Sequence, residues 1–109
     1  MTRVGLSRGV LALVAVGLAS TPAWVAPNAS RVVMKAAAFE PQQVTVHVGE
    51  AVEWVNEDIV AHTATARDKS WEANVLPGRN GRVTMKSTGS FKYFCRYHPN
   101  MTGEVVVEP

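Results

Sequence analysis

Three side chains that can bind a metal ion follow one another at intervals of three near the end of this 109-residue chain. They are Cys95, His98 and Met101. A thiolate, an imidazole and a thioether together form a soft to borderline donor set, which favours copper. A tight loop that closes a hairpin can bring all three side chains onto one ion, so this segment predicts a metal centre.

A fourth ligand has to come from elsewhere in the chain, and the remaining histidines are His47 and His62. His47 lies in the middle of an alternating run, on the polar side with Thr45, and is expected to point to solvent. His62 follows a loop and opens a new strand, 33 residues before Cys95. By position, His62 is the better candidate of the two.

The segments that must position these residues show the two-residue alternation of β-strands. After residue 23, no window of ten or more residues repeats at the helical period. Short strands separated by turn residues are typical of an all-β sandwich or barrel. Strands are expected at 31–35, 42–48, 51–55, 62–66, 83–86, 91–95 and 105–107, with an edge or turn at 39–41 and a long surface connection at 67–81.

Large apolar residues occupy inward positions of the expected strands. Trp54 and Phe91 are expected in the core by alternation, and Met34 and Met85 are expected there too. Because methionine commonly fills gaps between packed elements, the alternative for Met101 is a core side chain that binds no metal. Trp71 lies in the long connection and is expected to pack on the sandwich.

A series of short motifs runs through the chain in a fixed order: Phe39-x-Pro41, Val44-x-Val46, Gly49, Val52-x-Trp54-x-Asn56-x-Asp58, His62 and Gly89-x-Phe91-x-Tyr93-x-Cys95-x-x-His98-Pro99-x-Met101-x-Gly103-x-Val105. In this order and spacing they resemble the cupredoxin family, in particular its plastocyanin and amicyanin group. The resemblance covers roughly residues 31–108. The short loop that carries the last three candidate ligands is most similar to amicyanin-type members.

This resemblance implies a Greek-key β-sandwich of about seven to eight strands that binds one type 1, or blue, copper ion. It also implies the arrangement of the ligands around that ion. His62, Cys95 and His98 would form a trigonal plane, and Met101 would make a weak axial contact.

Two positions depart from the pattern of the family. Thr63 stands where many members have Asn, whose side chain ties the two ligand loops together. The hydroxyl of Thr63 could make the same link. Tyr97 stands where amicyanin-type loops often have Pro.

The N-terminal segment has the layout of a secretory signal peptide. Arg3 and Arg8 precede an uncharged run from residue 9 to residue 19, and small residues follow it. We expect residues 1–23 to be the signal peptide, cleaved after Ala23, with an uncleaved anchor as the alternative. Residues 24–30 are then a flexible leader and residues 31–109 the copper-binding domain. The protein is expected in the periplasm or an equivalent exported space, without stable membrane insertion once processed.

Charge and cysteine content exclude several classes of function. Removal of residues 1–23 leaves nine basic and nine acidic residues, so a nucleic-acid interface lacks its electrostatic basis. A single cysteine cannot form an internal disulfide.

Between residues 67 and 98 the bases outnumber the acids, which indicates a solvated face or a basic rim that steers acidic partners. These bases include Arg67, Lys69, Arg79, Arg82, Lys92 and Arg96.

The predicted site leaves no open position for a substrate, so we expect a carrier of single electrons and not an enzyme. The chain would be a monomer that docks weakly and transiently on redox partner proteins near His98. The alternative is a periplasmic copper-binding or delivery protein without an electron-transfer partner, although the chain has no Met-rich or His-rich run. A zinc hydrolase would need an open fourth position, and Met101 in register argues against it.

Overall fold

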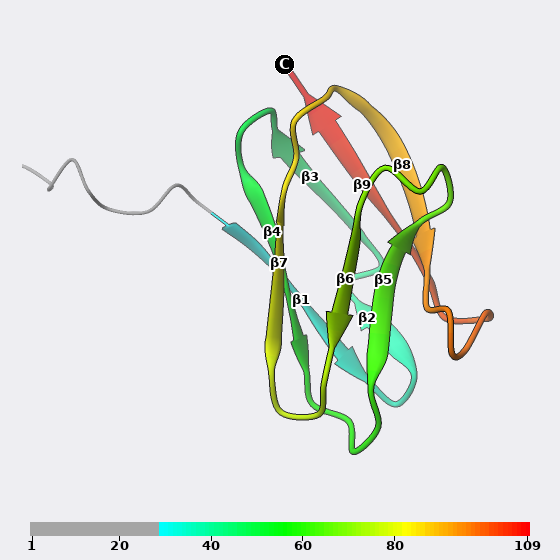
Figure 1. Cartoon of the computed structure of the whole chain (residues 1–109). Coiled ribbons are helices and arrows are strands. Elements are labelled where there is room, and N and C mark those ends of the chain that lie inside the picture. Colours follow the sequence, from blue (N-terminus) through cyan, green and yellow to red (C-terminus); the bar gives the residue numbers. More distant parts are fainter. Residues whose placement is uncertain (1–28) are drawn as a thin grey trace, which may run out of the picture.

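The computed structural model describes residues 29–109, which form two β-sheets packed face to face (Figure 1). The four-stranded sheet has the order β2-β1-β4-β7, and the five-stranded sheet has the order β3-β9-β8-β5-β6. The strands are β1 (Ala29–Lys35), β2 (Ala38–Glu40), β3 (Gln43–His47), β4 (Ala51–Asn56), β5 (His62–Ala66), β6 (Glu72–Val75), β7 (Asn80–Thr84), β8 (Gly89–Phe94) and β9 (Thr102–Glu108).

The predicted all-β sandwich is confirmed, with nine strands in the described part of the chain in place of seven or eight. The predicted signal peptide and residues 24–28 of the predicted leader lie outside the described residues. β1 begins at Ala29, so the last two residues of the predicted leader belong to the sandwich. Within residues 29–109 no helix is long and apolar enough to cross a membrane.

The expected long surface connection at 67–81 is wrong, because it contains β6 and the start of β7. In β6 only Ala73 and Val75 face the core, whereas Glu72 and Asn74 are exposed. A four-residue edge strand with so little apolar surface gives a weak pattern. Gly81 in β7 lets the two strands approach, because a Cβ there would lie 2.7 Å from Cγ2 of Val75.

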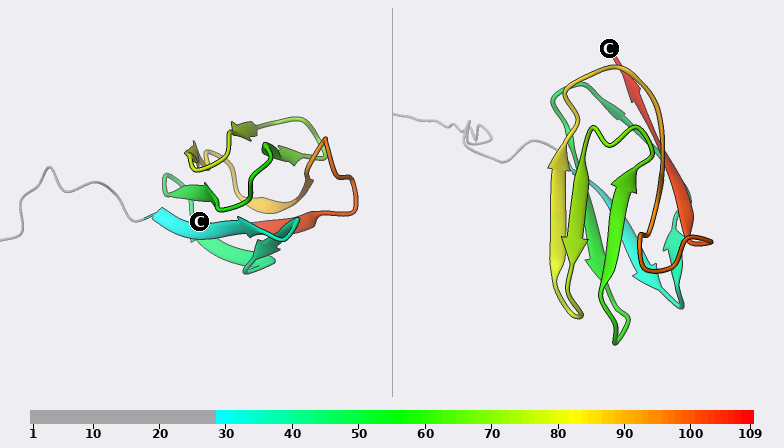
Figure 2. Two further views of the ribbon diagram at one scale, coloured as in Figure 1. Left: turned by 90° about the horizontal axis from the view of Figure 1, so that it is seen from below. Right: turned by 45° about the vertical axis from the view of Figure 1, so that its right-hand side comes forward.

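The strands that carry the candidate ligands are neighbours in the five-stranded sheet. β5 pairs antiparallel with β8, and the register places Thr65 opposite Phe94. The first residue of β5 and the residue after the end of β8 therefore lie at the same end of the sheet (Figure 2). That end also carries the loops between β4 and β5 and between β6 and β7 (Figure 1).

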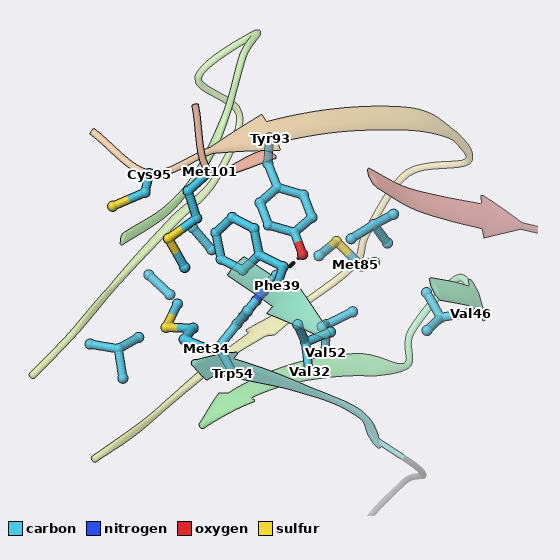
Figure 3. Packing of buried hydrophobic residues seen from close by; sticks show 14 of the residues in the cluster. Val32, Met34, Phe39, Val46, Val52, Trp54, Met85, Tyr93, Cys95 and Met101 are labelled. Carbon is cyan, nitrogen blue, oxygen red and sulfur yellow. Dashed lines mark hydrogen bonds between the residues drawn. The ribbon is translucent and has the colours of Figure 1, made fainter. Parts of the chain in front are cut away.

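Aromatic rings fill the centre of the core (Figure 3). The indole Nε1 of Trp54 donates a hydrogen bond to the Tyr93 hydroxyl at 3.2 Å, and burial raises the pKa of Tyr93 to about 12. Trp71 packs 5.5 Å from Trp54 between ring centroids, which confirms its predicted place. Met34 and Met85 are buried as expected, and Phe91 is half-buried against the same cluster.

Candidate metal centre

The loop between β8 and β9 carries three of the four predicted ligands. Cys95 follows the last residue of β8, and Met101 precedes the first residue of β9. Three backbone hydrogen bonds close the loop: Cys95 N–H to the Met101 carbonyl at 3.0 Å, His98 N–H to the Cys95 carbonyl at 3.2 Å, and Met101 N–H to the His98 carbonyl at 2.8 Å. The spacing of three residues between Cys95, His98 and Met101 therefore corresponds to two successive backbone turns, each closed by an N–H to carbonyl hydrogen bond.

The structure brings His62, Cys95 and His98 together, with one ligand atom of each within 4.8 Å of the others. The Cys95 Sγ lies 3.7 Å from Nδ1 of His62 and 3.7 Å from Nδ1 of His98. Bonds of about 2.0 to 2.3 Å to nitrogen and sulfur would place one ion between these three atoms. Both imidazoles thus turn the same nitrogen toward the sulfur.

Met101 is buried in the core cluster at the end where Cys95 lies (Figure 3). Its backbone carbonyl binds the Cys95 N–H, which fixes the two residues to each other. Its predicted role as a weak axial ligand stays a prediction. His47, the other candidate, lies at the exposed end of β3 beside Glu50 and Glu108, so the structure places it outside this cluster.

The sulfur of Cys95 is covered and receives a backbone hydrogen bond. The Thr63 N–H donates to Sγ at 3.3 Å, and the side chain of Cys95 has no exposed surface. The bond gives the buried sulfur a hydrogen-bond partner inside the sandwich. It also ties the strand that carries His62 to the loop that carries the thiol.

The hydroxyl of Thr63 makes a second link between the two ligand segments, as the sequence suggested. Its Oγ1 accepts a hydrogen bond from the Arg96 N–H at 2.8 Å and lies 2.9 Å from the hydroxyl of Thr65. Thr65 in turn donates to Glu72, which binds the Arg96 guanidinium at 2.7 and 2.9 Å. Hydrogen bonds thus link Thr63, Thr65, Glu72 and Arg96 in a closed ring, which holds the start of the loop between β8 and β9 against β5 and β6.

The imidazole of His62 is fully buried, and Asp58 holds it from behind. The Asp58 carboxylate lies 2.7 Å from Nε2 of His62 and accepts hydrogen bonds from the N–H groups of Ala36 and Ala37 at 2.8 and 3.0 Å. Burial opposes ionisation of Asp58, but the bonds from Ala37, His62 and Ala36 together lower its pKa below the ordinary value. The Nδ1 of the ring is left to face Cys95.

His98 is half-buried and packs its ring against His62, with centroids 4.9 Å apart. Exposed apolar side chains lie in the loops at this end of the sandwich. Tyr97, whose hydroxyl lies 3.3 Å from Nδ2 of Asn74, is 48% exposed. The others are Ile59, Val60 and Leu76.

Sequence reasoning assigned no role to Asp58 or Glu72, although both hold residues of the site. A carboxylate four residues before a candidate histidine ligand was the available signal for Asp58. Glu72 also changes the interpretation of the basic rim, because it pairs with Arg96. The Arg67 guanidinium lies over the ring of Phe94, 4.7 Å from its centroid.

Comparison with known proteins places this architecture and site in a family. The family model described as a cupredoxin-like domain matches residues 9–107. The chain is a cupredoxin. This agrees with the resemblance found in the sequence motifs, and it accounts for the sandwich and the position of the ligand cluster at one end of it.

Relatives of this cupredoxin include amicyanin and plastocyanin. It is 31% identical to amicyanin of Paracoccus versutus over 61% of this chain, a match that spans 54% of the relative's length. It is 33% identical to plastocyanin of Scenedesmus fuscus, over 64% of this chain and 86% of the relative. The crystal structure of amicyanin from Paracoccus versutus superimposes with a TM-score of 0.67 at 29% identity, over 79% of this chain and 87% of that one.

Proposed function

We propose that this cupredoxin binds one copper ion and carries single electrons between redox partners. The observation that supports this most directly is the pair of 3.7 Å distances from the Cys95 sulfur to the two imidazole Nδ1 atoms. A thiolate with two imidazoles in this arrangement, and a thioether available as a weak ligand, is the donor set of type 1 copper. Copper, when bound, supplies the one-electron change between its two oxidation states.

The residues of this chain fit the task because they restrict movement of the ligands. Asp58 and the Thr63 backbone hold His62 and the sulfur from the side of the sandwich. Ligands that keep their positions lower the rearrangement that accompanies a change in charge. The same packing buries His62 and Cys95 completely, so a molecule in solution cannot contact these two side chains in the folded state.

The path for the electron is expected to run through His98, the half-buried ligand of the set. Exposed apolar residues in the nearby loops offer a docking surface for a partner, namely Ile59, Val60, Leu76 and Tyr97. Contacts of small area without many ion pairs suit brief, weak encounters. Action as a monomer in the periplasm or an equivalent exported space is part of the proposal, and the predicted signal peptide supports it.

A colour test on the purified protein decides the metal and its ligands. Cupric ion should give an intense blue colour that a mild reductant bleaches. Cys95→Ser should abolish the colour, whereas the control His47→Ala should keep it, because His47 lies outside the cluster. A colourless protein that binds zinc in preference to copper would contradict the proposal.

A second measurement separates an electron carrier from a copper delivery protein. The blue protein should retain its copper for hours against a competing chelator and should exchange electrons rapidly with its own reduced form. Rapid loss of copper to the chelator, with slow self-exchange, would favour delivery instead.

A further inference from the structure

The Asp58 carboxylate contacts three groups from two other segments of the chain. Two are the backbone N–H groups of Ala36 and Ala37, in the turn between β1 and β2. The third is Nε2 of His62 at the start of β5. Asp58 itself is fixed by a hydrogen bond from its N–H to the side chain of Asn56 at 2.8 Å. The carboxylate therefore links the four-stranded and five-stranded sheets at the end where His62, Cys95 and His98 lie.

The turn that Asp58 binds has an unusual backbone for its sequence. Ala36 and Ala37 have φ angles of 52° and 54°, in the left-handed region. Two-residue hairpin turns with both φ angles positive are normally built from Asn and Gly, because a Cβ disfavours this region. Neither alanine carries a polar side chain to stabilise the turn. The two hydrogen bonds to Asp58 are the side-chain contacts that hold it.

The contact with His62 determines which ring nitrogen carries the proton. An ionised carboxylate accepts hydrogen bonds and cannot donate them. A neutral imidazole facing it at 2.7 Å must place its single proton on Nε2, which leaves the lone pair on Nδ1. Nδ1 is the atom that faces the Cys95 sulfur. A carboxylate behind a metal-ligating histidine fixes the orientation of the ring and raises its basicity as a ligand.

We propose that Asp58 is a positioning residue of the metal centre, which holds His62 in the metal-binding tautomer and couples its orientation to the β1–β2 turn. The part that concerns metal affinity rests on the proposed copper function. The part that concerns the tautomer belongs to the metal-free chain. A change in the conformation of the turn, which lies in the opposite sheet, should therefore alter the orientation of His62 through the Asp58 carboxylate.

The test compares Asp58→Asn with the neighbouring substitution Glu57→Gln. Both remove one carboxylate, but the Glu57 side chain lies 4.0 Å from Lys35 and outside the hydrogen bonds of His62. Nitrogen NMR of the metal-free proteins should show His62 protonated at Nε2 in the wild type and in Glu57→Gln. Asp58→Asn should show a mixture of tautomers. Its affinity for Cu(I) should fall about 10- to 100-fold, with a raised reduction potential.

A second background separates the role of Asp58 at the histidine from its role in folding. Ala36→Gly with Ala37→Gly removes the cost of the left-handed turn, so Asp58→Asn in this background should fold. The change in tautomer and the loss of affinity should persist there. An unchanged His62 tautomer and an affinity within twofold of the background protein would overturn the proposal. If the wild type takes up no copper, the proposed function fails, while the NMR result still decides the link between Asp58 and His62.

Discussion

The two histidines of the candidate metal centre are held in different ways. His62 sits at the start of a strand, fully buried, with Asp58 behind its ring and its neighbour Thr63 bonded to the sulfur. His98 sits in a loop and is half-buried, and within residues 29–109 its outer ring nitrogen has no hydrogen-bond partner. One side of the centre is therefore built into the sandwich, whereas the other is supported mainly through the backbone of its loop.

Removal of each imidazole should expose this difference most strongly. His62→Ala would leave a cavity and deprive Asp58 of a partner, so the free energy of unfolding of the metal-free protein should fall by about 2–5 kcal/mol. His98→Ala should change it by about 0.5 kcal/mol, as expected for a residue near the surface. Chemical denaturation of both variants measures the two values. Equal losses would show that the two histidines are held alike.

Thr63→Val tests how the loop of His98 is attached to the strand of His62. The substitution keeps the shape of the side chain but removes the acceptor of the Arg96 N–H. An unpaired, partly buried N–H should cost about 1–2 kcal/mol of unfolding free energy. Hydrogen exchange at the Arg96 amide should also become faster. Thr45→Val, at an exposed position of β3, is the control and should change neither value.

Glu72→Gln should give the smallest effect, and one that depends on pH. The hydrogen bond from Arg96 is the main cause that lowers the pKa of Glu72, and Thr65 adds to it. A lowered pKa in the folded state means that the contribution is present above the ordinary value of 4.5 and is lost as pH falls through the folded pKa. Because the pair is exposed, the wild type should exceed the variant by less than about 1 kcal/mol at neutral pH.

Denaturation at neutral pH and in acid checks this dependence. The gap between the wild type and Glu72→Gln should shrink in acid, whereas Glu40→Gln, an exposed carboxylate of β2, should show no such trend. A gap that widens in acid would contradict the assigned pairing.

The sequence predicted the features that depend on local spacing. Alternating apolar residues predicted most of the strands, and the interval of three predicted the ligand loop. The choice of His62 over His47 followed from the position of each residue relative to strand and loop, and the structure brings only His62 to the cluster among the described histidines outside the loop.

The contacts that could not be predicted join residues that are far apart in the sequence, and no sequence pattern shows which residues pair. Asp58 acts on backbone N–H groups 21 and 22 residues away, and every residue except proline offers such a group. Two alanines give no turn signal, so the turn that receives Asp58 could not be predicted. The pairing of Glu72 with Arg96 spans 24 residues, and it makes one of the bases of the predicted basic rim part of a structural contact.

The only thiol of the sequence is fully covered in the folded chain. Disulfide exchange and oxidation to sulfenic acid both require a sulfur that a reagent can reach. Once the sandwich has formed, neither a second copy of the chain nor peroxide can attack Cys95 unless the ligand loop opens. The vulnerable interval is therefore the time before folding, and early closure of the loop preserves the thiol chemically.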